Sequence, residues 1–167
     1  MLFKGKVYLF GDNIDTDQIY PGRYLELSEY KEIARYAMEG CRPGFADCFE
    51  QGGIIIAKRN FGCGSSREHA VIALKILGVS AIIAESFARI FYRNAINIGL
   101  PILECQDDLY RTLQEQDLLR VDLDRGLIQE IESGNEHQAA PFPPFMQEII
   151  RLGGLVEYVQ KRLRETG

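Results

Sequence analysis

The sequence predicts an α/β fold, a mostly parallel central sheet flanked by helices, and three observations support this class. Ile54–Ala57 is a continuous apolar run, which is typical of a strand covered on both faces. A glycine-rich turn follows it. The next segment, residues 65–77, carries apolar residues at helical spacing and ends at Gly78. Because strand, turn and helix recur in this order, we expect β–α–β units and parallel strands.

The remaining elements of the N-terminal two thirds fit the same pattern. A strand at Val7–Phe10 ends at the polar loop Gly11–Asn13, and we expect Asp12, Asn13 and Asp15 to shape that loop. A weakly helical segment precedes Gly52. Further elements are expected as a strand at Val79–Ala84, a helix at Phe87–Ile98 and a strand at Leu100–Leu103.

The C-terminal third predicts a hairpin and helices. Apolar and polar residues alternate on both sides of the turn Asp124–Gly126, as in two antiparallel strands. Residues Ser133–Pro144 are expected to form an exposed loop, followed by helices at Phe145–Leu152 and Leu155–Leu163. At 167 residues the chain fits one domain, 1–167.

Composition and charge exclude several function classes. With 19 basic and 24 acidic side chains the net charge is -5, so no nucleic-acid partner is expected. No apolar run is long enough to span a bilayer and no signal segment is recognisable, which predicts cytoplasmic residence without a membrane partner.

The cysteines do not have the spacing of a metal site. Cys41, Cys48, Cys63 and Cys105 lie 7, 15 and 42 positions apart, without a CxxC pair. We therefore expect this chain to bind no metal. Cys41, Cys48 and Cys105 are predicted to be buried or half-buried thiols.

The segment GCGSSREHA, residues 62–70, carries the chemistry that the sequence suggests. Glycines next to Ser65 and Ser66, between a strand and a helix, allow close approach to an anion, and Arg67 suits a carboxylate. The plainer interpretation makes both serines N-caps of the helix. A serine hydrolase is less convincing, because no GxSxG elbow exists and His69, four residues after Ser65, is better explained as structural, bonding a backbone carbonyl.

Three linked motifs carry a resemblance to a known family: GDNIDTDQIYPGRYL, NFGCGSSREHA and SFARIFYRNAINIGLP. In this order, within residues 5–105, they resemble the 3-isopropylmalate dehydratase small subunits of the aconitase superfamily. The resemblance implies a swivelling β/β/α domain that closes over the active site of a separate large subunit. It also implies that the large subunit, and not this chain, holds a [4Fe-4S] cluster.

The same resemblance implies roles for individual residues. Ser65 matches the base that removes the proton next to the hydroxyl-bearing carbon, and Gly64, Ser66 and Arg67 match groups that bind a carboxylate of a small dicarboxylate substrate. Asp17 matches an aspartate that pairs with a histidine of the other subunit. The alternative interpretation is that the Asp17 carboxylate only shapes the loop.

The resemblance implies that substrate choice depends on a mobile loop at about residues 20–42, and mainly on its first part, residues 20–27. The negative charge of Glu26 does not suit a third substrate carboxylate, although Arg23 lies close, so isopropylmalate is favoured. Leu25 and Leu27 either line an isopropyl pocket or belong to the core. The substrate-loop residues so identified are Arg23, Tyr24, Leu25, Glu26 and Leu27.

The resemblance implies a hydro-lyase that isomerises 2-isopropylmalate to 3-isopropylmalate in leucine biosynthesis, active only with its large subunit. Alternatives of the same type are the small subunit of homoaconitate hydratase or of another substituted-malate dehydratase, such as 2,3-dimethylmalate dehydratase. A non-catalytic anion-binding module and a stand-alone serine hydrolase belong to other classes. Arg89 and Arg93, one helical turn apart, face either the large subunit, the substrate or solvent.

Overall fold

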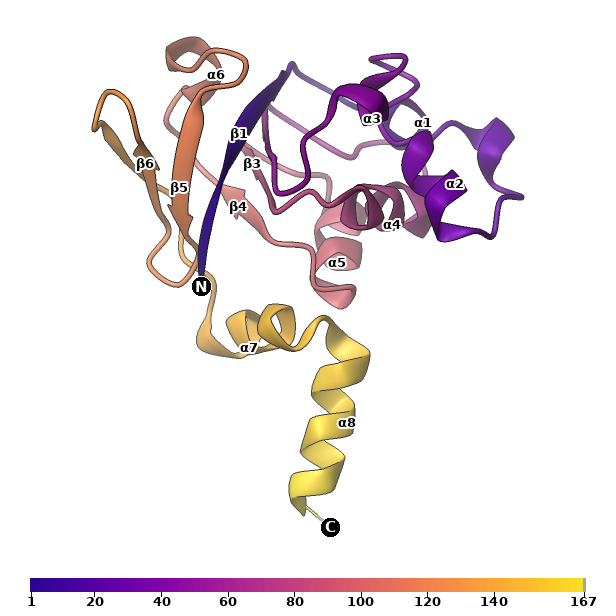
Figure 1. Cartoon of the computed structure of the whole chain (residues 1–167). Coiled ribbons are helices and arrows are strands. Elements are labelled where there is room, and N and C mark those ends of the chain that lie inside the picture. The colour runs from indigo at the N-terminus through magenta and orange to yellow at the C-terminus, as the bar shows by residue number, and fades with distance from the viewer. Residues whose placement is uncertain (167) are drawn as a thin grey trace.

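The computed structural model describes residues 1–166, and within them seven strands form one sheet. Its strands are β1 (Leu2–Phe10), β2 (Ile54–Ala57), β3 (Ala81–Ala84), β4 (Ile102–Glu104), β5 (Leu118–Asp122), β6 (Leu127–Glu130) and β7 (Glu136–Gln138). They lie in the order β4-β3-β2-β1-β5-β6-β7 (Figure 1). We call β1 to β4, which pair in parallel, the parallel half. Strands β5 to β7, which pair antiparallel, form the antiparallel half. The predicted α/β class is confirmed.

Strand β1 belongs to both halves. Its first part, Leu2–Lys6, pairs antiparallel with β5, and its second part, Val7–Phe10, pairs parallel with β2. The predicted strand covered only the second part. Lys4 does not interrupt the strand, because its side chain is exposed to solvent while the backbone continues its pairing with β5.

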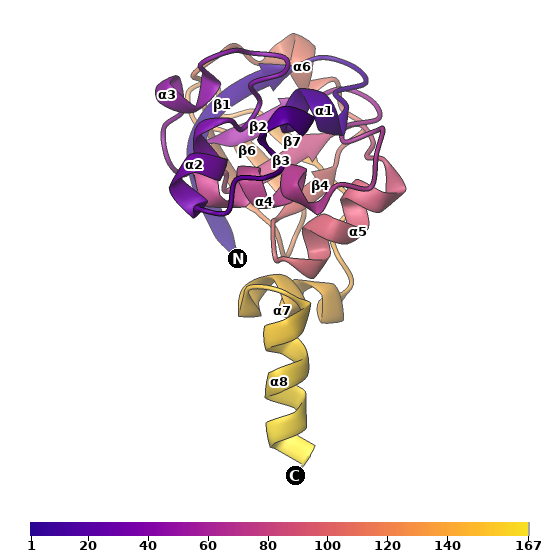
Figure 2. The ribbon, with the colours of Figure 1, turned by 90° about the vertical axis from the view of Figure 1, so that its right-hand side faces the viewer.

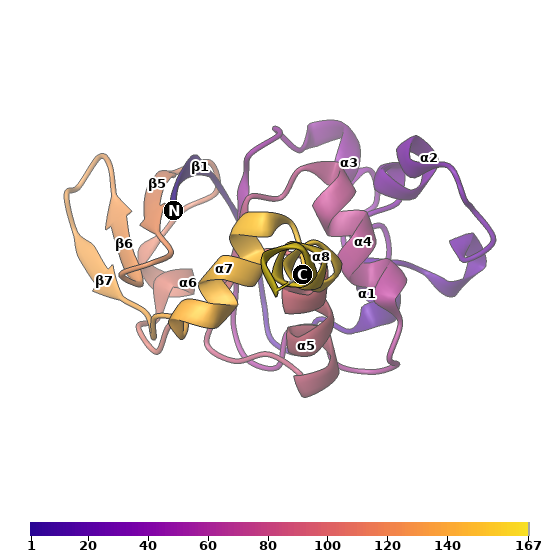
Figure 3. The same ribbon diagram turned by 90° about the horizontal axis from the view of Figure 1, so that it is seen from below.

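Helices cover the parallel half and extend below the sheet. They are α1 (Thr16–Ile19), the 3₁₀ helix η1 (Gly22–Tyr24), α2 (Tyr30–Arg35), α3 (Phe45–Cys48), α4 (Glu68–Leu77), α5 (Arg89–Asn97), α6 (Leu109–Thr112), α7 (Pro144–Leu152) and α8 (Leu155–Thr166). Helices α1, α2 and α4 lie together on one side of the molecule, while α8 projects away from its body (Figure 2). Seen from below, α1 and α2 lie at the end opposite β6 and β7 (Figure 3).

The core lies between β2, β3 and the helices around them. All residues of Ile54–Ala57 are buried, as predicted for a strand covered on both faces. Helix α4 contributes a buried stripe to the core and ends at Gly78, which has the left-handed conformation (φ +94°). The predicted helix stop is confirmed. The buried residues of α4 are Ala70, Val71, Ala73 and Leu74.

The sequence prediction was wrong about the segment Ser133–Pro144, which is not simply an exposed loop. Residues Glu136–Gln138 form β7 at the edge of the sheet, and Ala139 and Phe142 are buried after it. The polar composition of β7 hides it from pattern analysis, because an edge strand needs only one paired side. The hairpin β5–β6 and helices α7 and α8 agree with the prediction.

Candidate functional site

Two loops that are far apart in the sequence meet at the carboxyl ends of β1 and β2. The backbone N–H of Thr16 donates to the carbonyl of Cys63 at 2.8 Å, and the N–H of Gly62 donates to the carbonyl of Ile14 at 2.7 Å. The loop that follows β1 therefore lies against residues 60–67, which we call the glycine loop. Ligands of parallel α/β sheets commonly bind at this edge, so the location suits a functional site.

Glycine is required at position 62 for two reasons. Its φ of +80° is a conformation that L side chains rarely adopt. A Cβ there would also lie 2.2 Å from Cγ of the buried Phe91 ring. The loop is therefore pressed against helix α5, which fixes the path of the residues that follow.

The serines that follow are not helix caps, and that interpretation was wrong. Helix α4 begins at Glu68, its N-cap is Arg67, and the N-cap side chain makes no capping hydrogen bond. Ser65 instead lies in the loop, where its Oγ is 3.0 Å from Oγ1 of Thr16. Ser65 and Ser66 are both exposed, which leaves them accessible to a ligand.

Arg67 reaches back to the first motif. Its Nη1 donates to Oδ1 of Asp17 at 2.7 Å, and the same oxygen accepts the backbone N–H of Gly22 at 2.9 Å. These hydrogen bonds, that from Arg67 first, hold the pKa of the Asp17 carboxyl below its ordinary value. The guanidinium also passes closely over Gly22, where an added Cβ would lie 3.2 Å from Nη1. Arg67, Asp17 and the start of the expected substrate loop thus share one place.

The rest of the expected substrate loop is held by aromatic contacts. Tyr24 stacks on Tyr36, with ring centroids 3.8 Å apart, and the Arg23 guanidinium lies 4.7 Å from the Tyr24 ring centroid. The buried Tyr20 hydroxyl donates to the carbonyl of Tyr24 at 2.9 Å. Leu25 and Leu27 are half-buried against the core, whereas Glu26 is exposed.

The ring of His69 lies parallel to the ring of Tyr20, with centroids 6.2 Å apart. This contact agrees with a structural role, although it is a ring stack and not the expected bond to a backbone carbonyl. Among residues 1–166, the hydrogen-bonding partner of the Ser65 hydroxyl is Thr16 and not a histidine. The arrangement does not resemble a serine-hydrolase triad.

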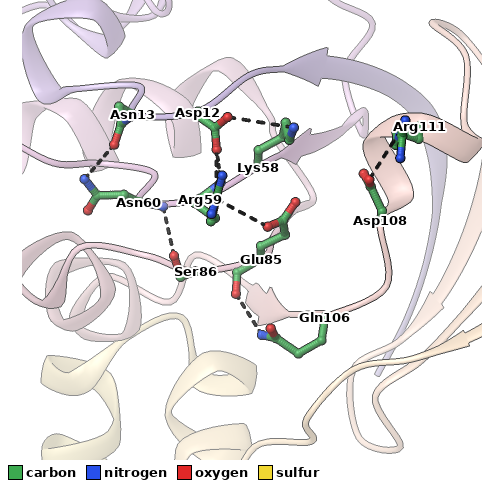
Figure 4. A network of polar contacts seen from close by, with 10 residues as sticks. All are labelled: Asp12, Asn13, Lys58, Arg59, Asn60, Glu85, Ser86, Gln106, Asp108 and Arg111. Carbon is green, nitrogen blue, oxygen red and sulfur yellow. Dashed lines mark hydrogen bonds and ion pairs between the residues drawn. The ribbon is translucent and has the colours of Figure 1, made fainter.

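Polar residues join the strand ends along the carboxyl edge of the parallel half (Figure 4). Asp12 accepts the backbone N–H of Arg59 at 3.1 Å, and the Asn60 side chain donates to Asn13 at 3.0 Å. Asp15 caps α1 by accepting the N–H of Gln18 at 2.7 Å. The loop-shaping roles predicted for Asp12, Asn13 and Asp15 are confirmed.

Arg89 and Arg93 are exposed and line a hollow of about 440 Å³ between α5 and α7. Ser65 and Arg67 do not line it. Apolar side chains form much of its wall, so it is a feature separate from the serine and arginine loop. The other lining residues are Phe87, Tyr92, Ile96, Asn97, Glu104, Phe145, Met146 and Ile149.

The prediction for Cys48 was wrong, because this thiol is exposed at the end of the short helix α3. Cys105 is buried and Cys41 half-buried, as predicted, and burial raises the pKa of Cys41 to about 11. Within the described part of the chain, no group of three or more His, Cys, Asp or Glu side chains could hold a metal ion. Nor does any helix among residues 1–166 have the length and apolar character needed to cross a membrane.

Comparison with known proteins agrees with this architecture. The model of the aconitase C-terminal domain matches residues 46–108, which include β2, β3 and the glycine loop. The crystal structure of 3-isopropylmalate dehydratase (LeuD) from Methanocaldococcus jannaschii has a TM-score of 0.91 and 41% identity, and the match covers 100% of both chains. Fold and domain together define a subunit of the aconitase superfamily.

Curated relatives define the family within that class. The 3-isopropylmalate dehydratase small subunit of Halothermothrix orenii is 56% identical over 99% of this chain and 100% of its own. The small subunit of Caldicellulosiruptor bescii is 51% identical over 99% of both chains. This chain belongs to the family of 3-isopropylmalate dehydratase small subunits.

Proposed function

We propose that this chain is the small subunit of a hydro-lyase that isomerises 2-isopropylmalate to 3-isopropylmalate in leucine biosynthesis. The observation that carries the proposal is the meeting of Ser65, Arg67 and Asp17 at the carboxyl edge of the parallel half. The whole-length similarity to small subunits of this enzyme supports it.

In the proposed reaction, Ser65 takes a proton from the carbon next to the hydroxyl-bearing carbon of the substrate. A serine hydroxyl needs donors around it to act as a base, and the loop amides and the Arg67 guanidinium are available nearby. Arg67, Ser66 and the backbone around Gly64 bind a substrate carboxylate. Rehydration runs the same steps in reverse with the hydroxyl and the proton exchanged between the two carbons.

In the free chain, Asp17 holds the guanidinium that is needed for the substrate. We infer that Asp17 turns to a histidine of the large subunit on assembly, which leaves Arg67 to bind a carboxylate. The 67% exposure of the Asp17 side chain leaves it accessible to such a partner. The pair is only loosely held, because ion pairs at exposed sites contribute little to stability.

The departing hydroxyl requires a Lewis acid, and in this proposal it is a [4Fe-4S] cluster in the large subunit. Within residues 1–166 no side-chain group suits such a cluster. This chain would then supply proton transfer and carboxylate binding, and the partner would supply the metal chemistry. Cytoplasmic residence of the assembled enzyme is part of the same proposal.

Isopropylmalate is the substrate that the side chains of the substrate loop, residues 20–42, favour. Glu26 is exposed and negative, so it repels a third carboxylate, and Arg23 is engaged over the Tyr24 ring. Packing of Leu25 and Leu27 against the core favours core positions over pocket walls in the free chain. We propose that residues 20–42 move on closure of the domain over the substrate. Homoaconitate and 2,3-dimethylmalate remain the alternative substrates.

The experiment is reconstitution. The purified chain is assayed alone and after anaerobic mixing with its cognate, cluster-loaded large subunit, with 2-isopropylmalate, homoaconitate and 2,3-dimethylmalate as substrates. We expect no turnover by the chain alone and a preference of the pair for 2-isopropylmalate. Preference for another malate would overturn the substrate assignment, and labelling of the lone chain by a phosphonate probe would favour a hydrolase.

A further inference from the structure

We propose that Thr16 is a positioning residue for Ser65, a role that rests on the proposed function. The two hydroxyl oxygens lie 3.0 Å apart, although the residues are 49 positions apart in the sequence. Thr16 is only 3% exposed, while Ser65 is exposed. The buried hydroxyl therefore contacts the candidate base from the protein side and leaves its other side open to a substrate.

The backbone fixes the place of Thr16 firmly. Its N–H donates to the carbonyl of Cys63 at 2.8 Å, and its carbonyl accepts the N–H of Tyr20 at 2.9 Å. It is also the first residue of α1, whose N-cap is Asp15. Both the backbone N–H and the backbone carbonyl of Thr16 are thus hydrogen-bonded, and its side-chain hydroxyl contacts Ser65.

Gly64 leaves room for this contact. A Cβ at position 64 would lie 3.3 Å from Oγ1 of Thr16, and the φ of +97° disfavours any other residue there. The glycine next to the serine therefore has a local purpose besides approach to an anion. It lets two loops come close enough for their hydroxyls to meet.

The chemistry assigns the direction of the hydrogen bond. A serine that accepts a proton from carbon needs a lone pair aimed at that proton, so Thr16 donates its own proton to Ser65 Oγ. As the C–H bond breaks, its electron pair forms the carbon–carbon double bond while the hydroxyl leaves the neighbouring carbon. Ser65 enters this step as the alkoxide, its own proton having passed to solvent, and the abstracted proton converts it to the neutral hydroxyl, while Thr16 keeps its own proton. A donor to a charged oxygen is stronger than one to a neutral oxygen, so Thr16 helps most when Ser65 is deprotonated.

The test uses the reconstituted pair with wild-type chain, Thr16→Val and Thr16→Ser. Valine keeps the shape and removes the hydroxyl, whereas serine keeps the hydroxyl. We expect Thr16→Val to lower kcat about 10- to 100-fold, the size of one hydrogen bond to a charged group, with little change in KM. Thr16→Ser should recover most of kcat. Substrate deuterated at the abstracted position should show a larger isotope effect with Thr16→Val, because proton removal becomes slower.

The matched control is Thr112→Val, an exposed threonine of α6, which should leave kcat unchanged. If Thr16→Val does not fold or assemble, Thr16→Ala and Thr16→Ser provide the same comparison. A normal kcat without the hydroxyl, an equal loss with serine, or a loss confined to KM would overturn the inference. A wild-type pair that is inactive toward 2-isopropylmalate but dehydrates another malate would contradict the proposed function instead, and the Thr16 variants would then be compared with that other malate.

Discussion

The parallel and antiparallel halves each contain a cluster of a serine, a carboxylate and a cationic or basic side chain, but the two clusters differ in burial. In the parallel half, Ser65, Asp17 and Arg67 lie on loops at the strand ends, and Asp17 is largely exposed. In the antiparallel half, Glu130 is only 9% exposed and lies in a strand. The carboxylate is therefore largely exposed in one half and buried in the other, although Ser133 of the second cluster is exposed and His137 is half-buried.

The antiparallel cluster is internally satisfied. Glu130 accepts hydrogen bonds from Ser133 and from Asn135, and its other oxygen lies 2.8 Å from Nε2 of His137. Nδ1 of His137 lies 3.2 Å from a carboxylate oxygen of Asp107. A buried carboxylate whose partners all come from the protein helps to hold the fold together and is not open to a ligand. The comparison teaches that an exposed carboxylate at the strand ends, and not residue type alone, marks the candidate site.

The largest expected difference between the two halves is the effect of removing a serine hydroxyl on kcat. Ser65→Ala should lower kcat of the reconstituted enzyme about 1,000-fold, within the range for loss of a general base, and leave the unfolding midpoint nearly unchanged. The control Ser133→Ala should leave kcat unchanged and lower stability by about 1 kcal/mol. Steady-state kinetics and chemical denaturation measure both. Normal turnover by Ser65→Ala would contradict the role of Ser65.

Two glycines with positive φ allow the same comparison in terms of the backbone. Gly62→Ala would place Cβ 2.2 Å from the Phe91 ring, and Gly126→Ala would place it 2.4 Å from the Ala139 carbonyl oxygen. Each should cost about 2 to 4 kcal/mol of stability from strain and crowding. At a temperature where both variants are folded, only Gly62→Ala should lower kcat, because only it moves the serine loop. Equal kinetics in both variants would argue against the loop as the site.

Substitution of Arg67 should have a smaller effect on the kinetics than loss of Ser65. Arg67→Lys keeps the charge but loses bidentate geometry, so we expect kcat/KM to fall about 10- to 30-fold, mainly through KM. Arg120→Lys, an exposed arginine of β5, is the control and should behave as wild type. Substrate titrations of the two variants in parallel decide the matter, and equal KM values would remove Arg67 from the carboxylate site.

The smallest effect concerns pH and the antiparallel half. Burial raises the pKa of Glu130, but the hydrogen bonds from Ser133, His137 and Asn135 outweigh burial and hold it below its ordinary 4.5. A lowered folded-state pKa stabilises the fold above pH 4.5, and that stability is lost as the pH falls through the folded pKa. Glu130→Gln should therefore cost about 1 kcal/mol at neutral pH, and this difference should shrink below pH 4.5. Denaturation from pH 7 to 3 measures it, and a constant difference would contradict the assignment.

Local patterns were sufficient for much of the fold. The apolar run at Ile54–Ala57 and the helix ending at Gly78 are set by burial and by glycine conformation, which a short window contains. The three-residue strand β7 was missed because its pairing comes from β6 and its own residues are polar. The first part of β1 was missed because lysines on an exposed face resemble a loop.

The site was only partly predictable for a similar reason. Motifs identified Ser65, Arg67 and Asp17 as candidates, but no local signal told capping serines from loop serines. That distinction depends on Thr16, which folding brings to Ser65 from 49 positions away. The Asp17–Arg67 ion pair is equally non-local. The pattern of one segment does not show which distant residues that segment will contact.

The shared strand β1 has a consequence for how the chain folds during synthesis. Its residues emerge before those of the other strands, yet the partner of Leu2–Lys6 is β5, at residues 118–122. The partner of Val7–Phe10, β2, emerges much earlier. The strands of the parallel half, with the loops of the candidate site, are therefore all present in the nascent chain while the start of β1 still presents an unpaired edge. Since long-range pairing is slow and exposed edges associate with other chains, this interval is when the growing protein is most open to misassembly.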